Sequence, residues 1–305
     1  MKLVISIAGG VGKQIMFTAM LPSLSTLYDE IHIQSPYDLV FQNNPYVTSL
    51  NEDFSQTSYK KMLRKDDTRI VIQDPYDQES FIKKKEHLLN TWWRLCTSIE
   101  LEPGQISETP ELYLSSSELN KCDALIDNIK GKDDKPYMLV QFSGGQSPLS
   151  YDDGSTGDSF DYINDPIQRA LPPKYMEKLV LELRKRFPDH TLLRYGLPNE
   201  YVPRKIDDEI AVLSPPVSYN LYKRLAEEAD AIVCIDSSLQ HIAAAAHKKA
   251  TVIWSGTSPD HFGWNIHTNL REEQKDDDYP YFRLTGQIQD VIFPHVQDVL
   301  DCIKI

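Results

Sequence analysis

Cysteine is scarce in this sequence, and the four cysteines, at positions 96, 122, 234 and 302, lie far apart. They form no Cys-x-x-Cys pair and have no histidine beside them, which argues against a structural zinc site or a disulfide framework. Long apolar runs are also lacking, because stretches such as residues 232–235 and 243–246 are far shorter than the roughly 20 residues that cross a bilayer. The first residues lack the pattern of a signal peptide, so we expect the protein in the cytoplasm.

Positive charge is in deficit as well, since 32 basic against 45 acidic side chains leave a formal net charge of −13. This balance disfavours broad non-specific binding of nucleic acid, although a sum does not reveal a local basic cleft. Lysine and arginine cluster only at residues 60–65 and 83–85, which form either a solvated face or a surface for an anionic acceptor. With 41% apolar and 25% charged residues, the chain has the composition of a folded protein.

Predicted strands and predicted helices alternate along both halves of the chain. We expect strands at residues 2–7, 30–34, 69–73, 136–142, 191–195, 231–235 and 251–254, and helices at 14–27, 78–98, 173–187, 218–229 and 238–246. Such alternation predicts right-handed crossovers and parallel sheets. A polar break with glycine and proline at residues 131–136 separates the halves. We therefore predict an α/β fold of two Rossmann-like domains facing each other across a cleft, with domains at 1–133 and 134–289 and a closing helix within 290–305.

A glycine turn follows the first expected strand and contains Gly9, Gly10, Gly12 and Lys13. It differs from the phosphate-binding loop of nucleotide hydrolases, which needs a glycine where Ile7 stands and a hydroxyl directly after the lysine. Glycines still allow the backbone to approach a ligand closely, and the following helix N-terminus favours negative charge. A tight turn without a ligand is the alternative interpretation.

The most informative segment is residues 229–245, where a buried strand ends at Asp236 and two serines open the next helix. The backbone amides of Ser237, Ser238 and Leu239 would be unpaired at that helix N-terminus, where the helix dipole adds positive potential. Parallel sheets bind ligands at the carboxyl ends of their strands, so this segment suits a diphosphate. The alternative is that Asp236 or Ser237 merely caps the helix.

The amino-acid sequence of this segment resembles that of a known family. Asp-Ser-Ser-Leu-Gln-His-Ile-Ala-Ala-Ala at 236–245, followed by a strand ending in Ser-Gly-Thr-Ser-Pro at 255–259, is similar to the signature of the ADP-heptose:lipopolysaccharide heptosyltransferases, glycosyltransferase family nine. Leu-Pro-Pro-Lys-Tyr at 171–175 and Asn-Pro-Tyr-Val at 44–47 match further family segments in the same order. The resemblance implies a GT-B fold, an N-terminal acceptor domain, a C-terminal nucleotide-sugar domain, and inverting transfer without a bound metal.

The resemblance also implies roles for single residues. The amides of Ser237, Ser238 and Leu239 would hold the diphosphate together with the side chain of Arg169. His241 would touch the sugar or phosphate, or else be a structural histidine of the helix. The carboxylate of Glu200, next to Gly196, would accept the ribose hydroxyls. The loops that border the donor cleft would be formed by Gly9, Gly10, Gly12, Ser143, Gly144, Gly145 and Asp236.

One departure from the family concerns catalysis. The family's glycine turn ends in Gly-Asp, and that aspartate is its general base, whereas this chain has Gly12-Lys13. A protonated lysine cannot take a proton from an alcohol, although it can neutralise a departing diphosphate. Either burial keeps Lys13 neutral, or its role is electrostatic and another carboxylate is the base.

An acidic loop offers candidates for that carboxylate. Residues 151–161 are rich in aspartate, glycine and serine, where the family has a shorter connection. We predict that one aspartate of this loop reaches the cleft as base or sugar ligand; a solvated loop is the alternative. The candidates are Asp152, Asp153, Asp158 and Asp161.

These observations predict a glycosyltransferase that moves a hexosyl, heptosyl or pentosyl group, with inversion, from a nucleoside-diphosphate sugar to an acceptor hydroxyl. The expected acceptor is a saccharide of lipopolysaccharide or of another surface glycan, membrane-associated glycolipids included. The sugar nucleotide is the donor substrate, and no cofactor or metal is expected. Two alternatives stay open: a phage-type transferase that modifies hydroxymethylated DNA bases, and a catalytically silent protein that binds nucleotide sugars.

Overall fold

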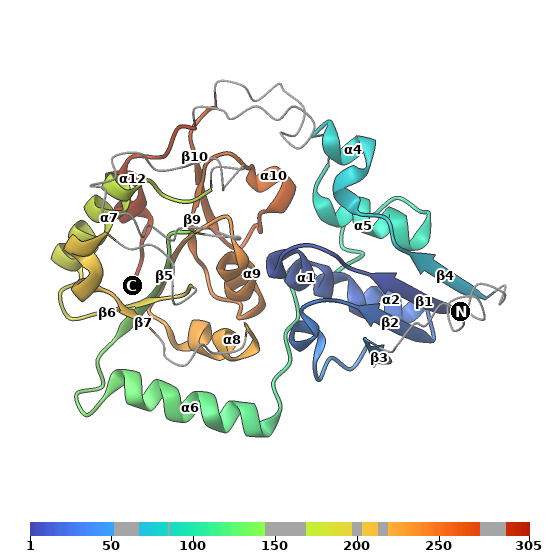
Figure 1. Cartoon of the computed structure of the whole chain (residues 1–305), viewed down its shortest axis with the longest axis horizontal. Helices are drawn as coiled ribbons and strands as arrows, with labels where there is room; N and C mark the ends of the chain where they lie inside the picture. The colour runs from blue at the N-terminus through green and yellow to red at the C-terminus, as the bar shows by residue number, and fades with distance from the viewer. Residues whose placement is uncertain (52–66, 85, 144–168, 197–202, 213–218, 275–290) are drawn as a thin grey trace, which may run out of the picture.

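The computed structural model describes residues 1–51, 67–84, 86–143, 169–196, 203–212, 219–274 and 291–305. The chain forms two lobes that lie side by side, each built on a parallel sheet (Figure 1). This arrangement confirms the predicted α/β class with two parallel sheets. The predicted boundaries at residues 133 and 289 stay predictions.

The N-terminal lobe has a four-stranded sheet in the order β3-β2-β1-β4, and every pair in it is parallel. The strands are β1 (Lys2–Ser6), β2 (Glu30–Gln34), β3 (Ser49–Leu50) and β4 (Thr68–Val71). The helices are α1 (Val11–Phe17), α2 (Leu21–Leu27), α4 (Glu79–Ile82) and α5 (Leu88–Thr97), with short 3-10 helices η1 (Thr18–Met20), η2 (Asp38–Phe41) and η3 (Pro75–Asp77). The apolar side chains of β1 are buried, as in a strand whose two faces are both covered.

The C-terminal lobe has a six-stranded sheet in the order β10-β9-β8-β5-β6-β7, again with every pair parallel. The strands are β5 (Tyr137–Gln141), β6 (Thr191–Arg194), β7 (Ala211–Val212), β8 (Ala231–Ile235), β9 (Thr251–Trp254) and β10 (Thr268–Arg271). The helices are α7 (Pro173–Arg186), η5 (Arg204–Glu209), α8 (Tyr219–Glu228), α9 (Ser238–Ala245), α10 (Pro259–Phe262) and α12 (Val296–Cys302).

The order of the strands reverses once in each sheet. In the C-terminal lobe the chain adds β6 and β7 on one side of β5, then β8, β9 and β10 on the other. In the N-terminal lobe it adds β2 and β3 on one side of β1, then β4 on the other. A crevice opens at the carboxyl ends of the strands where the order reverses, and open α/β sheets bind ligands there. The fold therefore predicts two ligand-binding crevices, one between β5 and β8 and one between β1 and β4.

Helix α6 (Ser116–Lys130) connects the lobes and packs under α8 (Figure 1). Its N-terminus is held by a capping box, in which Ser115 and Glu118 each bind the other's backbone amide. Between the sheets, α1 of one lobe packs on α9 of the other. Because both helices follow a strand directly, their packing brings the glycine turn after β1 close to the start of α9.

One expectation about helices was wrong, and the bounds of another were too wide. The predicted helix over residues 78–98 is interrupted, because α4 ends at Ile82 and Lys84 takes a left-handed backbone (φ 53°) before α5 begins at Leu88. The predicted closing helix begins late, at Val296, since residues 291–295 are not helical and a proline stands at position 294. Its Val299 and Leu300 pack into the apolar core with α7.

Candidate functional site

The site predicted from the sequence lies at the start of α9. Strand β8 ends at Ile235, and Ser237 is the N-cap residue, with an extended backbone (φ −158°, ψ −176°) and no capping bond from its side chain. The amides of Ser237 and Ser238 have no acceptor among the residues that the structure describes. Two donors at a helix N-terminus thus point to the crevice between β5 and β8.

The third amide of the predicted set is already paired, so that expectation was wrong. The N–H of Leu239 donates to Oε1 of Gln141 at 3.2 Å, and the hydroxyl of Ser237 donates to the same oxygen. Gln141 is the last residue of β5 and is buried. Its side chain therefore fixes the start of α9 from the neighbouring strand and leaves two amides, not three, open to a ligand.

Asp236 ties the helix to its own lobe. One carboxylate oxygen accepts from Nε2 of Gln240 at 2.9 Å, and the other accepts from Oγ1 of Thr257 at 2.7 Å. Its side chain is buried and does not cap α9. The alternative in which Asp236 is the cap was therefore wrong, because Ser237 is the N-cap residue. Its backbone carbonyl faces Arg169, whose Nη1 lies 3.5 Å away. The guanidinium of Arg169 is thus at the predicted end of the sheet.

His241 lies one turn into α9, where the lobes meet. Nε1 of Trp264 donates to its Nδ1 at 2.8 Å, so the neutral ring carries its proton on Nε2. Burial, helped by nearby His267, lowers the pKa of His241 to about 3. The ring is neutral at ordinary pH and packs against Gly12 of the other lobe.

The three glycines of the turn after β1 serve different purposes. Gly9 has a left-handed backbone (φ 94°), and a Cβ atom there would lie 3.1 Å from Nζ of Lys13. A Cβ at Gly12 would lie 3.0 Å from Cδ2 of His241, whereas one at Gly10 would meet nothing within 4 Å. The close approach that Gly12 allows is therefore to α9 of the other lobe.

Lys13 is buried at the other strand-order reversal, between β1 and β4. Its Nζ lies 3.1 Å from both carboxylate oxygens of Asp74, and its side chain is only 2% exposed. The ammonium also lies over the ring of Tyr76, 4.5 Å from the centroid, and 5.9 Å from that of Trp92. An ion pair and aromatic faces together stabilise a buried lysine charge. No pattern in the sequence indicated Asp74, which stands two residues after Ile72, the end of the apolar strand segment.

The remaining predicted residues divide into described and undescribed ones. Ser143 follows β5, is buried, and its hydroxyl has no hydrogen-bond partner among the described residues. Gly196 lies just after β6, beside Tyr195, whose hydroxyl is 3.0 Å from Oγ of Ser238. The ends of β5, β6 and β8 therefore meet at the start of α9. The predicted residues that fall outside the described part of the chain are Gly144, Gly145, Asp152, Asp153, Asp158, Asp161 and Glu200.

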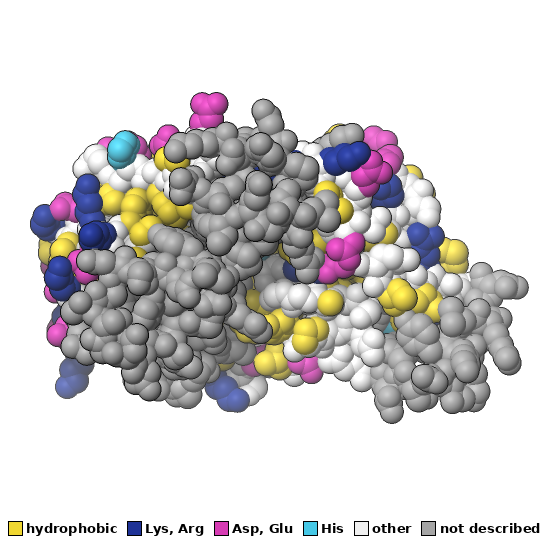
Figure 2. Space-filling view, turned by 45° about the horizontal axis from the view of Figure 1, so that its top comes forward, with side chains coloured by type: hydrophobic (Ala, Val, Ile, Leu, Met, Phe, Trp, Pro, Cys, Tyr) yellow, Lys and Arg dark blue, Asp and Glu magenta, His cyan; other side chains and the backbone are white. Residues whose placement is uncertain are grey.

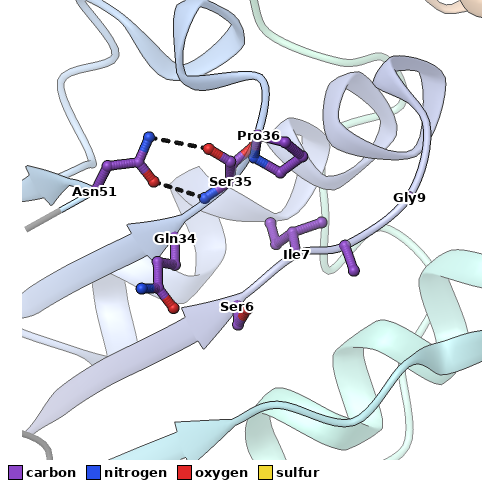
Figure 3. Close-up of a pocket in the computed structure, with 8 residues that line it drawn as sticks. Ser6, Ile7, Gly9, Gln34, Ser35, Pro36 and Asn51 are labelled. Carbon is purple, nitrogen blue, oxygen red and sulfur yellow. Dashed lines mark hydrogen bonds between the residues drawn. The ribbon is translucent and has the colours of Figure 1, made fainter. Parts of the chain in front are cut away.

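A pocket of about 370 Å³ opens at the carboxyl ends of β1 and β2 (Figure 3). Ser6 and Gln34 pair across the two strands and point to the same side, and the amide of Asn51 is held by two hydrogen bonds to the backbone of Ser35. Gly9 closes one end of the pocket, next to Lys13. Every described residue that lines the pocket is uncharged: Ser6, Ile7, Ala8, Gly9, Gln34, Ser35, Pro36 and Asn51.

Metal ligands and membrane spans were searched among the described residues. There, no three or more His, Cys, Asp and Glu side chains gather in a way that could hold a metal ion. Within the same ranges, no helix has the length and apolar character needed to span a membrane.

Comparison with known proteins agrees with this geometry. Residues 200–276 match the family model described as glycosyltransferase family 9 (heptosyltransferase). No curated protein matches the sequence. Among solved structures, a family 9 glycosyl transferase from Veillonella parvula has a TM-score of 0.66 at 9% identity, covering 99% of this chain and 95% of that one.

Two Escherichia coli structures are similar as well. ADP-heptose lipopolysaccharide heptosyltransferase II has a TM-score of 0.65 at 13% identity, covering 99% of this chain and 97% of that one. A heptosyltransferase solved with ADP has a TM-score of 0.51 at 13% identity, covering 90% and 94%. At such low identity these structures establish the fold, which is the GT-B fold of the heptosyltransferases. Residues 200–276 are thus similar to glycosyltransferase family 9, and nearly the whole chain has the fold of the heptosyltransferases.

Proposed function

We propose that this protein transfers a sugar, with inversion and without a metal ion, from a nucleoside-diphosphate sugar to a hydroxyl of a saccharide acceptor. The observation that carries the proposal is the pair of amides, from Ser237 and Ser238, at the strand-order reversal between β5 and β8. A diphosphate accepts hydrogen bonds from such amides and is attracted by the helix dipole. One of the similar structures is a heptosyltransferase with ADP and another is named as an ADP-heptose enzyme, which supports a nucleoside diphosphate as the leaving group.

Stabilising the departing diphosphate is the main task in this reaction. As the bond between the anomeric carbon and the phosphate oxygen breaks, negative charge grows on the leaving group. Donors that already point at this charge lower the barrier, because they need no reorganisation during the reaction. The amides of Ser237 and Ser238 are fixed in this way by Gln141, and the guanidinium of Arg169 adds a full positive charge nearby.

The acceptor belongs in the pocket of the N-terminal lobe. Its described lining combines hydroxyl and amide groups with the apolar side chains of Ile7, Ala8 and Pro36 and carries no charge, which suits an uncharged sugar unit better than a phosphate or carboxylate. We therefore propose a neutral sugar residue of lipopolysaccharide or of another surface glycan as the acceptor unit.

The surface charge weighs against the alternative of a DNA acceptor. On the face shown in Figure 2, the described basic side chains are interspersed with acidic ones and form no broad basic area. Lys83 is paired with Glu79, and the whole basic cluster at 60–65 lies outside the described residues. A duplex would require many uncompensated cationic contacts to its phosphates.

Calorimetric titration with ADP-, GDP-, UDP-, CMP- and dTDP-sugars tests the proposal. We expect the sugar nucleotides of one base to bind with a micromolar Kd. When an acceptor saccharide is added, the corresponding nucleoside diphosphate should be released. Binding without release across a panel of saccharides would favour the silent binding protein, and no binding at all would overturn the proposal.

A further inference from the structure

We infer that Asp74 is the general base of this enzyme and that Lys13 holds its carboxylate in place. The inference rests on the proposed transferase activity and assigns a residue that the sequence pattern did not indicate. It replaces the expectation that the base is supplied by the acidic loop at 151–161.

The topology places Asp74 at a ligand-binding position. It follows β4, three residues after the strand ends at Val71, and β4 lies next to β1 at the strand-order reversal of the N-terminal lobe. The glycine turn after β1 lies at the same reversal, and its Gly9 closes the acceptor pocket. The carboxylate therefore stands at the crevice in which this lobe would hold a ligand.

Two contacts fix the orientation of the carboxylate. Oδ1 accepts from the backbone amide of Tyr76 at 3.0 Å, which makes Asp74 the N-cap of η3. Nζ of Lys13, which is buried, donates to both carboxylate oxygens of Asp74 at 3.1 Å. Oδ2 has no further partner among the described residues, so it keeps an acceptor position for another proton.

Only one member of this ion pair is accessible. The side chain of Lys13 is 2% exposed and lies against the rings of Tyr76 and Trp92, whereas that of Asp74 is 22% exposed. A substrate can therefore reach the carboxylate but not the ammonium. Lys13 supplies the counter-charge that a half-buried carboxylate needs, and its own proton stays inside the protein.

The chemistry of the step is balanced with this assignment. The acceptor oxygen forms a bond to the anomeric carbon, and its proton moves to Oδ2 of Asp74. The bond from that carbon to the phosphate oxygen breaks, and the electron pair leaves with the nucleoside diphosphate. The carboxyl group afterwards returns its proton to water. A carboxylate is basic enough here, because the alcohol becomes strongly acidic as its oxygen bonds to carbon.

The glycine turn beside Lys13 borders both proposed substrate sites. A Cβ at Gly9 would lie 3.1 Å from Nζ of Lys13, so the wall of the acceptor pocket touches the ion pair. Gly12, one residue before Lys13, touches α9, the helix whose first amides we propose for the donor. The ion pair is therefore adjacent to the wall of the proposed acceptor pocket, and the glycine turn beside it reaches the helix proposed for the donor.

The first test compares Asp74→Asn with Asp77→Asn, an exposed aspartate on the same short helix. The probe is ADP-heptose with water as acceptor, and the readouts are the Kd of the donor and the rate of ADP release. We expect Asp74→Asn to bind the donor within threefold of the unaltered protein and to release ADP at least 100-fold more slowly. Asp77→Asn should match the unaltered protein in both measurements.

A second pair of variants guards against misfolding, since Asp74→Asn leaves a buried ammonium without its counter-charge. Lys13→Met alone keeps the carboxylate, and Lys13→Met combined with Asp74→Asn removes both charges. We expect the double variant to release ADP at least tenfold more slowly than Lys13→Met.

The outcomes separate the two proposals. Equal rates in the double variant and Lys13→Met, or an Asp74→Asn rate within fivefold of the unaltered protein, overturn the role of Asp74 alone. If the unaltered protein binds and turns over none of the five nucleotide sugars, the proposed function fails and the role of Asp74 fails with it.

Discussion

Gly12 of the N-terminal lobe lies directly against the imidazole of His241 in the C-terminal lobe, so that a Cβ atom at position 12 would be 3.0 Å from Cδ2 of the ring. The nearest backbone atom, Cα of Ser238, would be 3.6 Å away. The glycine turn and the start of α9 thus form one contact, and the separation of the lobes depends on the absence of a side chain there.

Gly12→Ala should therefore push the lobes apart. His241 is buried and held by Trp264, so it cannot yield without breaking a hydrogen bond. We expect a loss of about 1–3 kcal/mol in the free energy of unfolding, as for other overpacked sites. Gly10→Ala is the matched control, because its φ is −72° and no atom lies within 4 Å of a Cβ there. Equal stability of the two variants in urea titrations would contradict the close contact.

Acid should destabilise the protein through its buried histidines. Burial lowers the pKa of His87 and His267 to about 4, and that of His241 to about 3, from an ordinary value of 6.5. Between about pH 6 and 4 the unfolded chain binds protons that the folded protein does not, so the free energy of unfolding falls as pH falls. Each histidine contributes about 1.4 kcal/mol per pH unit in that window.

Urea titrations at several pH values measure this slope. His87 joins the lobes through Nε2 to the carbonyl of Gly263 at 3.2 Å, and His87→Asn removes one of these titrating groups. The slope of that variant between pH 6 and 4 should be lower by about 1.4 kcal/mol per unit. A stability that stays flat over this range in the unaltered protein would contradict burial as the cause.

Gln141 should be needed to hold the first turn of α9. Its Oε1 accepts from the Leu239 amide and from the Ser237 hydroxyl, both of which are buried. Gln141→Met keeps the size of the side chain but leaves the Leu239 amide without an acceptor and the Ser237 hydroxyl with only the Ile235 carbonyl, 3.3 Å away, which should cost about 1–3 kcal/mol of unfolding free energy. Gln42→Met, at an exposed position, should change it by less than about 0.5 kcal/mol. The network is refuted if both variants unfold at the same urea concentration.

Local patterns in the sequence predicted the strand-helix junction at the proposed donor site well. The run of apolar residues before Asp236 marks β8, and the serines mark the start of α9, because both features are properties of adjacent residues. The fold class followed from the alternation of such segments. The helix predicted across residues 78–98 was wrong because its apolar spacing continues through Lys84, whose backbone leaves the helical region.

What the sequence did not reveal depends on partners far apart in the chain. Asp74 pairs with Lys13 across 61 residues, and Gln141 binds the Leu239 amide across 98. Neither pair has a spacing that a pattern could detect, since both arise only when neighbouring strands meet in the sheet. The likeness to a family indicated a departure at Lys13, but only the packing of β1 beside β4 shows which carboxylate lies next to it.

The central claim, that the amides at the start of α9 bind the donor diphosphate, is tested most directly by replacing one amide. Ser238→Pro removes the N–H at the first helical position, where proline is tolerated, and Ser237 before it is already extended. Ser238→Ala keeps the N–H and removes only the hydroxyl that meets Tyr195.

The measurement is calorimetric titration of both variants and of the unaltered protein with ADP-heptose. Loss of a hydrogen bond to a charged group predicts at least a tenfold weaker Kd for Ser238→Pro, while Ser238→Ala should stay within threefold of the unaltered protein. A Ser238→Pro protein that is folded and binds ADP-heptose as tightly as the unaltered protein would contradict the account.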